Sequence, residues 1–360
     1  MGRIADRPAP GHLDASELRR YAFPVIHGLR ADPVPWLLEE DNPSVRYWTL
    51  VDLLDASPRN RLVTAARKAI MEKGTVPKIL AKQDKGGFWG IAEDFYVRAK
   101  YHGTTWQLMI LAELNADRND PRIRSACEFV LRASQDRESG GFAYRGGPSG
   151  GYHSAVVPCL TGNMVWSLIR LGFGSDPRVE HGIEWLTKHA RFDDGTGPAP
   201  AGWPYDKLEM CWGKHTCHSG VAKTLKALAE IPEKERSAEV ARTIAAAAEY
   251  FLRHHIHLRS HDLSKAVKLK WLKLGFPLMW DGDALEVFGI LAKLGFRDPR
   301  MGEAAELVLS KQDADGRWSL EDTYNGRFQV DIEKKGRPSK WVTLLALKAL
   351  KAYSPPPNRP

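Results

Sequence analysis

The densest group of reactive side chains lies between residues 211 and 218, where two cysteines and two histidines fall within eight residues. They are Cys211, His215, Cys217 and His218. Thiolate and imidazole are preferred zinc ligands, so this segment is a candidate metal site. The spacing matches no standard zinc finger, because the chain has no Cys-x-x-Cys pair. The alternative is that both cysteines are small buried residues with free thiols.

A second candidate is the pair of carboxylates in the segment Trp280-Asp281-Gly282-Asp283-Ala284, which precedes an apolar stretch with helical periodicity. A carboxyl group that faces an apolar cavity keeps its proton more readily, as a general acid must. A carboxylate at a helix start can instead cap the helix and interact with its dipole. Both roles are open for Asp283.

Residues 253–273 form the one local charge anomaly, with six basic side chains, four histidines and a single acid, Asp262. A basic segment of this kind can clamp a diphosphate or lie against an anionic lipid surface. It can equally be a solvated surface with no ligand.

A repeated pattern determines where these residues fall in the fold. An amphipathic run is followed by Gln-Asp, glycine and an aromatic residue, with the glutamines at Gln83, Gln135 and Gln312. Degenerate copies of the pattern lie near residues 185–203 and 250–254. A glutamine at a helix end can both donate and accept hydrogen bonds. We therefore expect it to satisfy backbone groups there and on the next repeat.

Each copy is followed by a second stretch whose apolar residues recur with the period of an α-helix. These stretches start near Thr104, Thr161, Thr216, Asp281 and Ser339, at intervals of 57, 55, 65 and 58 residues. Open TPR and HEAT solenoids have shorter periods, roughly 34 to 47 residues. Another amphipathic helix starts at Pro43, with Asn42 or Ser44 as its cap. No segment shows good strand alternation, so the sequence predicts an all-α array of helix pairs.

The Gln-Gly-aromatic repeat resembles the QW repeat of squalene–hopene cyclases and oxidosqualene cyclases. The helix-pair period is similar to that of the α/α toroid, which those cyclases share with the β subunits of protein prenyltransferases. The resemblance covers residues 40–352. It implies an inner barrel of helices, an outer layer around it, and an apolar cavity with the inner-helix starts at its mouth.

The resemblance also suggests two chemistries for the acidic pair. In class II terpene cyclases, the middle acid of an Asp-x-Asp-Asp motif donates the proton that starts cyclisation. Asp283 matches that acid, while Ala284 replaces the last one. In the prenyltransferases an aspartate, a cysteine two residues later and a histidine hold zinc. Here Asp283 stands in place of the cysteine, and the later helix start at Ser339-Lys340 lacks the histidine.

The candidate site residues are drawn from the inner-helix starts, which a toroid brings together. The catalytic candidates are Asp283, Asp281, His215 and Lys340. The substrate-binding candidates are His102, Thr104, Thr161, Asn163, Lys214 and Trp280. The metal candidates are Cys217, His218 and Cys211, for Zn²⁺ or Mg²⁺. Threonine, serine and asparagine at these positions, Ser339 included, can also serve as helix caps.

Composition narrows the class of protein. The 360 residues are 43% hydrophobic and 27% charged, which is ordinary for a chain with a large core. No apolar run approaches the length of a membrane span, and the first residues lack a secretory signal. With only four cysteines, we expect a cytoplasmic protein, with peripheral membrane attachment as an option. The net charge of +8 favours anionic partners but is too small to indicate nucleic acid.

The leading hypothesis is an isoprenoid- or lipid-handling enzyme with acid- or metal-assisted chemistry, whose partner is a hydrophobic small molecule or an isoprenoid diphosphate. One alternative is a non-catalytic toroid that binds a hydrophobic peptide or lipid and presents it to a partner. We expect an N-terminal arm with an extra helical segment over residues 1–40. A toroid of five to six helix pairs over 41–353 and a disordered proline-rich tail over 354–360 complete the prediction.

Overall fold

The computed structural model describes residues 26–213 and 215–354. These residues form helices joined by long connections, with two small antiparallel ribbons. One ribbon pairs β1 (Gly146–Gly147) with β2 (Gly150–Gly151), and the other pairs β3 (Leu258–Arg259) with β4 (Asp262–Ala266). The sequence predicted an all-α chain, and the described residues are mostly helical, with these two ribbons and a few isolated β-bridges besides the helices.

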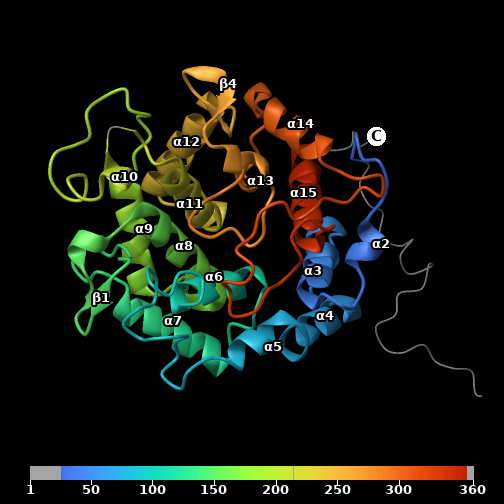
Figure 1. Ribbon diagram of the computed structural model, residues 1–360, viewed down its shortest axis with the longest axis horizontal. Coiled ribbons are helices and arrows are strands. Elements are labelled where there is room, and N and C mark those ends of the chain that lie inside the picture. Colours follow the sequence, from blue (N-terminus) through green and yellow to red (C-terminus); the bar gives the residue numbers. More distant parts are fainter. Residues whose placement is uncertain (1–25, 214, 355–360) are drawn as a thin grey trace, which may run out of the picture.

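Six inner helices lie around the middle of the molecule, and we call them the inner ring (Figure 1). They are α3 (Pro43–Trp48), α6 (Thr104–Glu113), α8 (Pro158–Leu168), α11 (His218–Ala229), α13 (Ala284–Lys293) and α15 (Lys340–Tyr353). From α6 onward each packs on the next, and α15 packs on α3. On its other side, α3 is linked to the end of α6 by Ser44 Oγ, which donates to the carbonyl of Leu114 at 2.7 Å. Every residue of α8 is buried, because this helix lies against α6, α11 and the outer helix that follows it.

A second set of helices lies outside this ring and packs against it. They are α4 (Arg61–Glu72), α5 (Thr75–Leu80), α7 (Pro121–Ala133), α9 (Pro177–His189), α12 (Ala238–Arg253) and α14 (Gly302–Ser310). The longer ones are amphipathic, so each buries one apolar face against the inner layer. Shorter helical elements are α2 (Val34–Leu37), α10 (Glu209–Trp212), π-helical turns at Thr49–Leu53 and Ile169–Phe173, and 3-10 turns at His153–Ala155, Glu233–Glu235, Leu269–Leu272 and Pro299–Met301.

The repeated glutamines connect neighbouring repeats. Gln83 Nε2 donates to the carbonyl of Arg122 at 2.9 Å, and Gln135 Nε2 donates to the carbonyl of Arg178 at 2.6 Å. Each of these glutamines follows one outer helix, and each acceptor lies at the start of the next. Gln312 Nε2 donates to the carbonyl of Gly28 at 2.8 Å and so ties the last repeat to the first described residues. The predicted role of these glutamines is confirmed.

A signal that the sequence reasoning missed accompanies these contacts. The tripeptide Asp-Pro-Arg occurs at residues 120–122, 176–178 and 298–300, always at the start of an outer segment. In each copy the aspartate accepts from the arginine backbone N–H and pairs with its guanidinium group. The proline fits the first helical turn, where its missing N–H is not needed. The motif therefore caps the outer segments. In its first two copies, the carbonyl of the arginine also accepts the hydrogen bond from the repeat glutamine.

The structure describes part of the predicted N-terminal arm and little of the predicted C-terminal tail. Residues 26–40, assigned from the sequence to the N-terminal arm, contact the last repeat through Arg30, whose backbone N–H donates to Gln312 Oε1 at 2.9 Å. Ile26 belongs to the same buried hydrophobic cluster as Leu350. Residues 1–25 of the arm, residues 355–360 of the tail and Lys214 lie outside the described residues. Among the described helices, none is both long and apolar enough to cross a lipid bilayer.

Candidate functional site

A cavity of about 680 Å³ lies inside the helix ring. All six inner helices, with the π-turns that extend α3 and α8, contribute to its wall. Much of that wall is apolar, with Trp48, Trp166, Phe276, Trp341 and Leu344 among its lining residues. A cavity of this size and character is suited to a small hydrophobic molecule.

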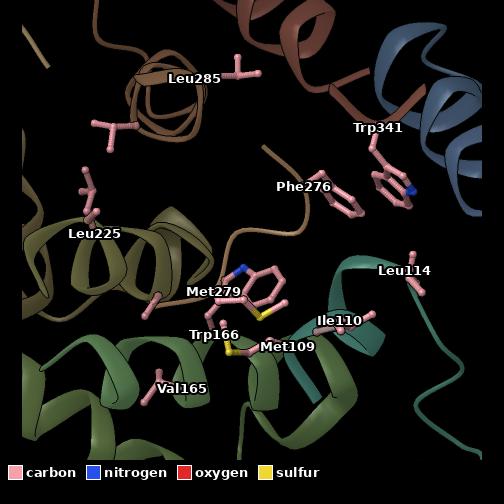
Figure 2. Close-up of a cluster of buried hydrophobic side chains, with 14 of the residues drawn as sticks. Met109, Ile110, Leu114, Val165, Trp166, Leu225, Phe276, Met279, Leu285 and Trp341 are labelled. Atoms are coloured by element: carbon pink, nitrogen blue, oxygen red, sulfur yellow. The ribbon is translucent and has the colours of Figure 1, made fainter. Parts of the chain in front are cut away.

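One end of the cavity is closed by the connection that precedes α13. Phe276 stacks on Trp341 with 4.2 Å between ring centroids, and Asn163 Nδ2 donates to the carbonyl of Met279 at 3.1 Å. Figure 2 shows Phe276 facing Trp341 and Met279 lying beside Met109 and Trp166. The loop therefore fills the space between the inner-helix starts.

The opposite end of the cavity is bordered by the C-terminal ends of the inner helices. Four ion pairs lie there, between Lys348 and Asp52, Lys351 and Asp55, Arg170 and Glu230, and Lys293 and Glu230. Several of these side chains are solvent-exposed, so the cavity opens on this side. The sequence analysis expected the mouth at the helix starts. The structure places the opening at the other end, because the long connection before α13 folds inward and buries its apolar residues.

Of the sequence-predicted site residues that the structure describes, only Asp283 lines the cavity. It is 1% exposed and lies at the closed end. Its Oδ1 accepts from the backbone N–H of Glu286 at 2.8 Å, which caps α13, and its Oδ2 accepts from the backbone N–H of Gly275 at 2.9 Å. Burial raises the pKa of Asp283 to about 7, against the effect of these two N–H groups. Asp283 therefore both caps α13 and carries a buried carboxyl group with a raised pKa.

A buried ion network lies beside Asp283 and was missed by the sequence reasoning. Lys223 Nζ contacts both carboxylate oxygens of Glu286, at 2.8 and 2.7 Å. Lys226 Nζ lies 2.6 Å from Glu113 and 3.2 Å from Glu286. Burial would raise the pKa of Glu286, but the two lysines outweigh it and the pKa is lowered. The available signal was two lysines three residues apart in a predicted inner helix whose other residues are mostly small or apolar.

Asp281 points away from the cavity and joins two elements. It accepts from Ser219 Oγ at 2.8 Å on α11 and from Trp271 Nε1 at 3.1 Å. Burial would raise the pKa of Asp281, but Lys268 and these hydrogen bonds outweigh it and the pKa is lowered. Asp281 is therefore a charged structural anchor for the connection before α13.

The predicted metal ligands do not form a metal site. Among the described residues, no group of three or more His, Cys, Asp or Glu side chains is arranged to hold a metal ion. The two ring nitrogens of His218 are 3.0 Å from the Tyr250 hydroxyl and 3.1 Å from the Ile256 carbonyl, so neither is available to a metal. Burial raises the pKa of the Cys211 thiol to about 12 and also raises that of Cys217. His215 is exposed to solvent and joins no cluster.

Two predicted substrate-binding threonines instead make hydrogen bonds that hold the fold together. Thr104 Oγ1 accepts from the backbone N–H of Trp89 at 3.1 Å, and Thr161 Oγ1 accepts from that of Phe142 at 2.9 Å. They anchor the turns of the repeat and do not take the alternative capping role, because the N-cap residues of α6 and α8 are Gly103 and Val157. The expected cap at Ser339 is confirmed by its bond from the Val342 N–H, as is the cap at Asn42.

Three further candidates lie outside the cavity wall. Lys340 pairs with Glu39 at 2.7 Å and with Asp41. The exposed His102 offers its carbonyl to Gln329 Nε2 at 3.1 Å. Trp280 Nε1 donates to the hydroxyl of Tyr101 at 3.2 Å. None of these side chains reaches Asp283, so the predicted catalytic set is not assembled around one point.

Comparisons with known proteins show weak likenesses. No protein-family model matches the sequence, and no curated protein matches it. Among solved structures, a protein from Actinoplanes is 18% identical with a TM-score of 0.43, over 88% of this chain and 89% of that chain. A possible GH105 family member from Salmonella enterica is 11% identical with a TM-score of 0.39, over 84% and 96%. The type II terpene cyclase MstE from Scytonema is 13% identical with a TM-score of 0.30, over 80% and 96%. Likenesses of this strength do not extend to activity or ligand.

Proposed function

We propose that the protein is an α/α toroid enzyme of the terpene cyclase type, which binds an isoprenoid or similar apolar lipid in its central cavity. The observation that carries this proposal is the position of Asp283, a buried carboxyl group at the closed end of an apolar cavity. In this role, protonated Asp283 donates a proton to the bound substrate. The aromatic walls then stabilise the resulting positive charge.

The chemistry of the cavity favours an uncharged isoprenoid over an isoprenoid diphosphate. The lysines and Arg170 at the mouth are already paired with acids, so a diphosphate there would compete with four existing ion pairs. A metal-dependent transferase is not supported, because the Cys211, Cys217 and His218 side chains do not fit a metal ion. We therefore propose acid chemistry with a neutral hydrophobic partner.

Filling the cavity tests the ligand site directly. Gly289 lies on α13 and lines the cavity, and a Cβ added there would meet only Ala349 Cβ, at 3.5 Å. The Gly289→Phe variant should bind farnesol at least about tenfold more weakly than the wild type, because the new ring occupies ligand space. Titration monitored by tryptophan fluorescence measures this.

The matched control is Gly289→Ala, which adds one methyl group and should leave farnesol binding unchanged. Alanine also favours the helix by about 0.5–1 kcal/mol, so this variant should be at least as stable as the wild type. Equal farnesol binding by Gly289→Phe and the wild type would contradict a ligand site in the cavity.

The acid role is tested with Asp283→Asn, assayed by gas chromatography–mass spectrometry with squalene and geranylgeraniol as substrates. Asparagine can still accept from the Glu286 N–H, but its amide nitrogen cannot accept from Gly275. A stability loss of about 1–3 kcal/mol is therefore expected alongside loss of turnover. The control is Ser339→Ala, which removes the cap of another inner helix and the hydrogen bond from Ser339 Oγ to Glu333, at a cost of about 1–3 kcal/mol. Turnover should persist in this control. Turnover by Asp283→Asn would contradict the acid role.

The pH dependence of stability gives a second test of the same residue. The folded-state pKa of Asp283, about 7, lies above its ordinary value of 3.8. Its protonation therefore stabilises the fold fully below pH 4, and this contribution is lost as the pH rises through 7. The unfolding free energy of the wild type, relative to Asp283→Asn, should fall by on the order of 4 kcal/mol between pH 4 and pH 8. Urea unfolding measures it, and a flat difference would contradict a protonated Asp283.

A second candidate function is a non-catalytic toroid that binds a hydrophobic peptide or lipid for a partner. The observation that favours it is that both oxygens of Asp283 already accept backbone hydrogen bonds. A purely structural carboxylate has the same arrangement. This alternative predicts farnesol binding that is blocked by Gly289→Phe, together with no product from any isoprenoid tested.

A further inference from the structure

Three aromatic side chains meet on the loop-covered end of the ring, outside the cavity. The rings of Tyr101 and Tyr324 stack with 3.9 Å between centroids, and Trp280 donates to the Tyr101 hydroxyl. They come from the connections before α6, α13 and α15. The last two of these connections cross the middle of the ring in Figure 1 and touch through Gly275 and Asp322.

Four cations surround these rings. Lys100, Lys268 and Lys270 lie 5.1, 5.7 and 5.8 Å from the Trp280 ring centroid. Arg327 lies 4.7 Å from the Tyr101 centroid. We call these four side chains, with Tyr101, Trp280 and Tyr324, the cationic–aromatic cluster. Each cation–π contact is individually weak, so the contacts do not by themselves neutralise the charge.

The acids near the cluster are too few to balance it. Lys270 lies 3.8 Å from Asp281 and 3.4 Å from Asp322. Within residues 26–213 and 215–354, no close ion pair is formed by Lys100, Lys268 or Arg327, and Lys268 shares Asp281 with Lys270 as an acid that it attracts from a greater distance. Burial lowers the pKa of Lys100, and the neighbouring Arg327 and Lys270 lower it further. The cations therefore repel one another, with Lys100 and Lys270 partly buried and Lys268 and Arg327 exposed.

We propose that the cationic–aromatic cluster binds a phosphate or diphosphate group at a site separate from the cavity. A phosphate group carries up to two negative charges and several acceptor oxygens on one compact centre, which matches convergent lysine and arginine side chains. The stacked rings form a wall of low polarity behind the cations, and this strengthens their attraction for an anion.

Two sources carry this chemistry, a soluble phosphate ester and the headgroup of a phospholipid. Leu269 lies between Lys268 and Lys270 and is 77% exposed, so a bound headgroup would place acyl chains beside it. The cluster lies on the outer side of the connection before α13, while Phe276 and Asp283 of that connection line the cavity. The proposal of a phosphate site is therefore independent of the function proposed for the cavity.

The test is isothermal titration calorimetry with sodium pyrophosphate, at low and high salt. Lys268→Ala and Lys100→Gln should each weaken binding at least about tenfold, because each removes a charge-assisted contact. Lys273→Ala removes an exposed lysine of the same segment outside the cluster and should leave binding unchanged. Lys268 is exposed, so its variant should retain the fold, which circular dichroism checks.

Vesicles of phosphatidylcholine with and without phosphatidic acid distinguish the two sources. Pyrophosphate binding without vesicle binding identifies a soluble ester. Binding to the acidic vesicles that is lost in both Lys268→Ala and Leu269→Ser identifies a headgroup. Either result supports the site. The absence of both kinds of binding, or equal weakening by Lys273→Ala and Lys268→Ala, would overturn it.

Discussion

Replacing Lys223 by methionine should destabilise the fold by about 3–5 kcal/mol. The Lys223 side chain is fully buried, and its ammonium group contacts both carboxylate oxygens of Glu286. Removing it leaves a buried carboxylate with only Lys226, 3.2 Å away and shared with Glu113. The loss measures the cost of an uncompensated buried charge, and urea unfolding at neutral pH reports it.

Two variants make this result specific. The double variant Lys223→Met/Glu286→Leu removes both charges and should be more stable than Lys223→Met alone. Replacing both members of a buried ion pair by apolar residues costs less stability than removing one member and leaving the other charge unpaired. The exposed pair between Lys68 and Glu72, 3.6 Å apart, is the surface control, and Lys68→Met should change stability by less than about 1 kcal/mol. A Lys223→Met protein as stable as the wild type would show that this network carries no charge.

Replacing Gly316 by alanine should cost about 3 kcal/mol or more. Gly316 belongs to the last Gln-Gly-aromatic turn and has a φ of +70°. A Cβ built there would lie 2.3 Å from the carbonyl oxygen of Ala31, so the first described residues would have to move away from the last repeat. Strain at the left-handed backbone and this collision add together, and thermal unfolding monitored by circular dichroism measures the sum.

Gly336 supplies the matched control in the same connection between α14 and α15. Its φ is +75°, but a Cβ there would meet nothing within 4 Å. Gly336→Ala should therefore cost only the conformational strain, about 1 kcal/mol. Equal losses in the two variants would mean that the close approach to Ala31 contributes nothing to stability.

The repeat made the helices predictable because it depends on local spacing. The inner stretches were expected to start near Thr104, Thr161, Thr216, Asp281 and Ser339, and the helices begin within about three residues of these positions. The contacts of Gln83, Gln135 and Gln312 also followed from local chemistry, since an amide at a helix end meets orphan backbone groups.

The candidate site was less predictable because its parts come from different repeats. Whether a connection folds inward, as the one bearing Phe276 does, depends on packing that the repeat does not encode. The partnership of Lys223 with Glu286 joins residues 63 positions apart, and a single sequence gives no sign of such pairing. His218 failed as a metal ligand for the same reason, since Tyr250 and Ile256 occupy its nitrogens from the neighbouring outer helix and loop.

Because α15 packs on α3 and Gln312 reaches Gly28, the first and last helices of the described residues support each other. An open solenoid can gain or lose one repeat and stay folded, since each unit depends only on its neighbours. Here, deletion of one helix pair would remove a neighbour from both ends of the array, because the first and last helices also contact each other. Denaturation of the described helices should therefore proceed as a single cooperative transition.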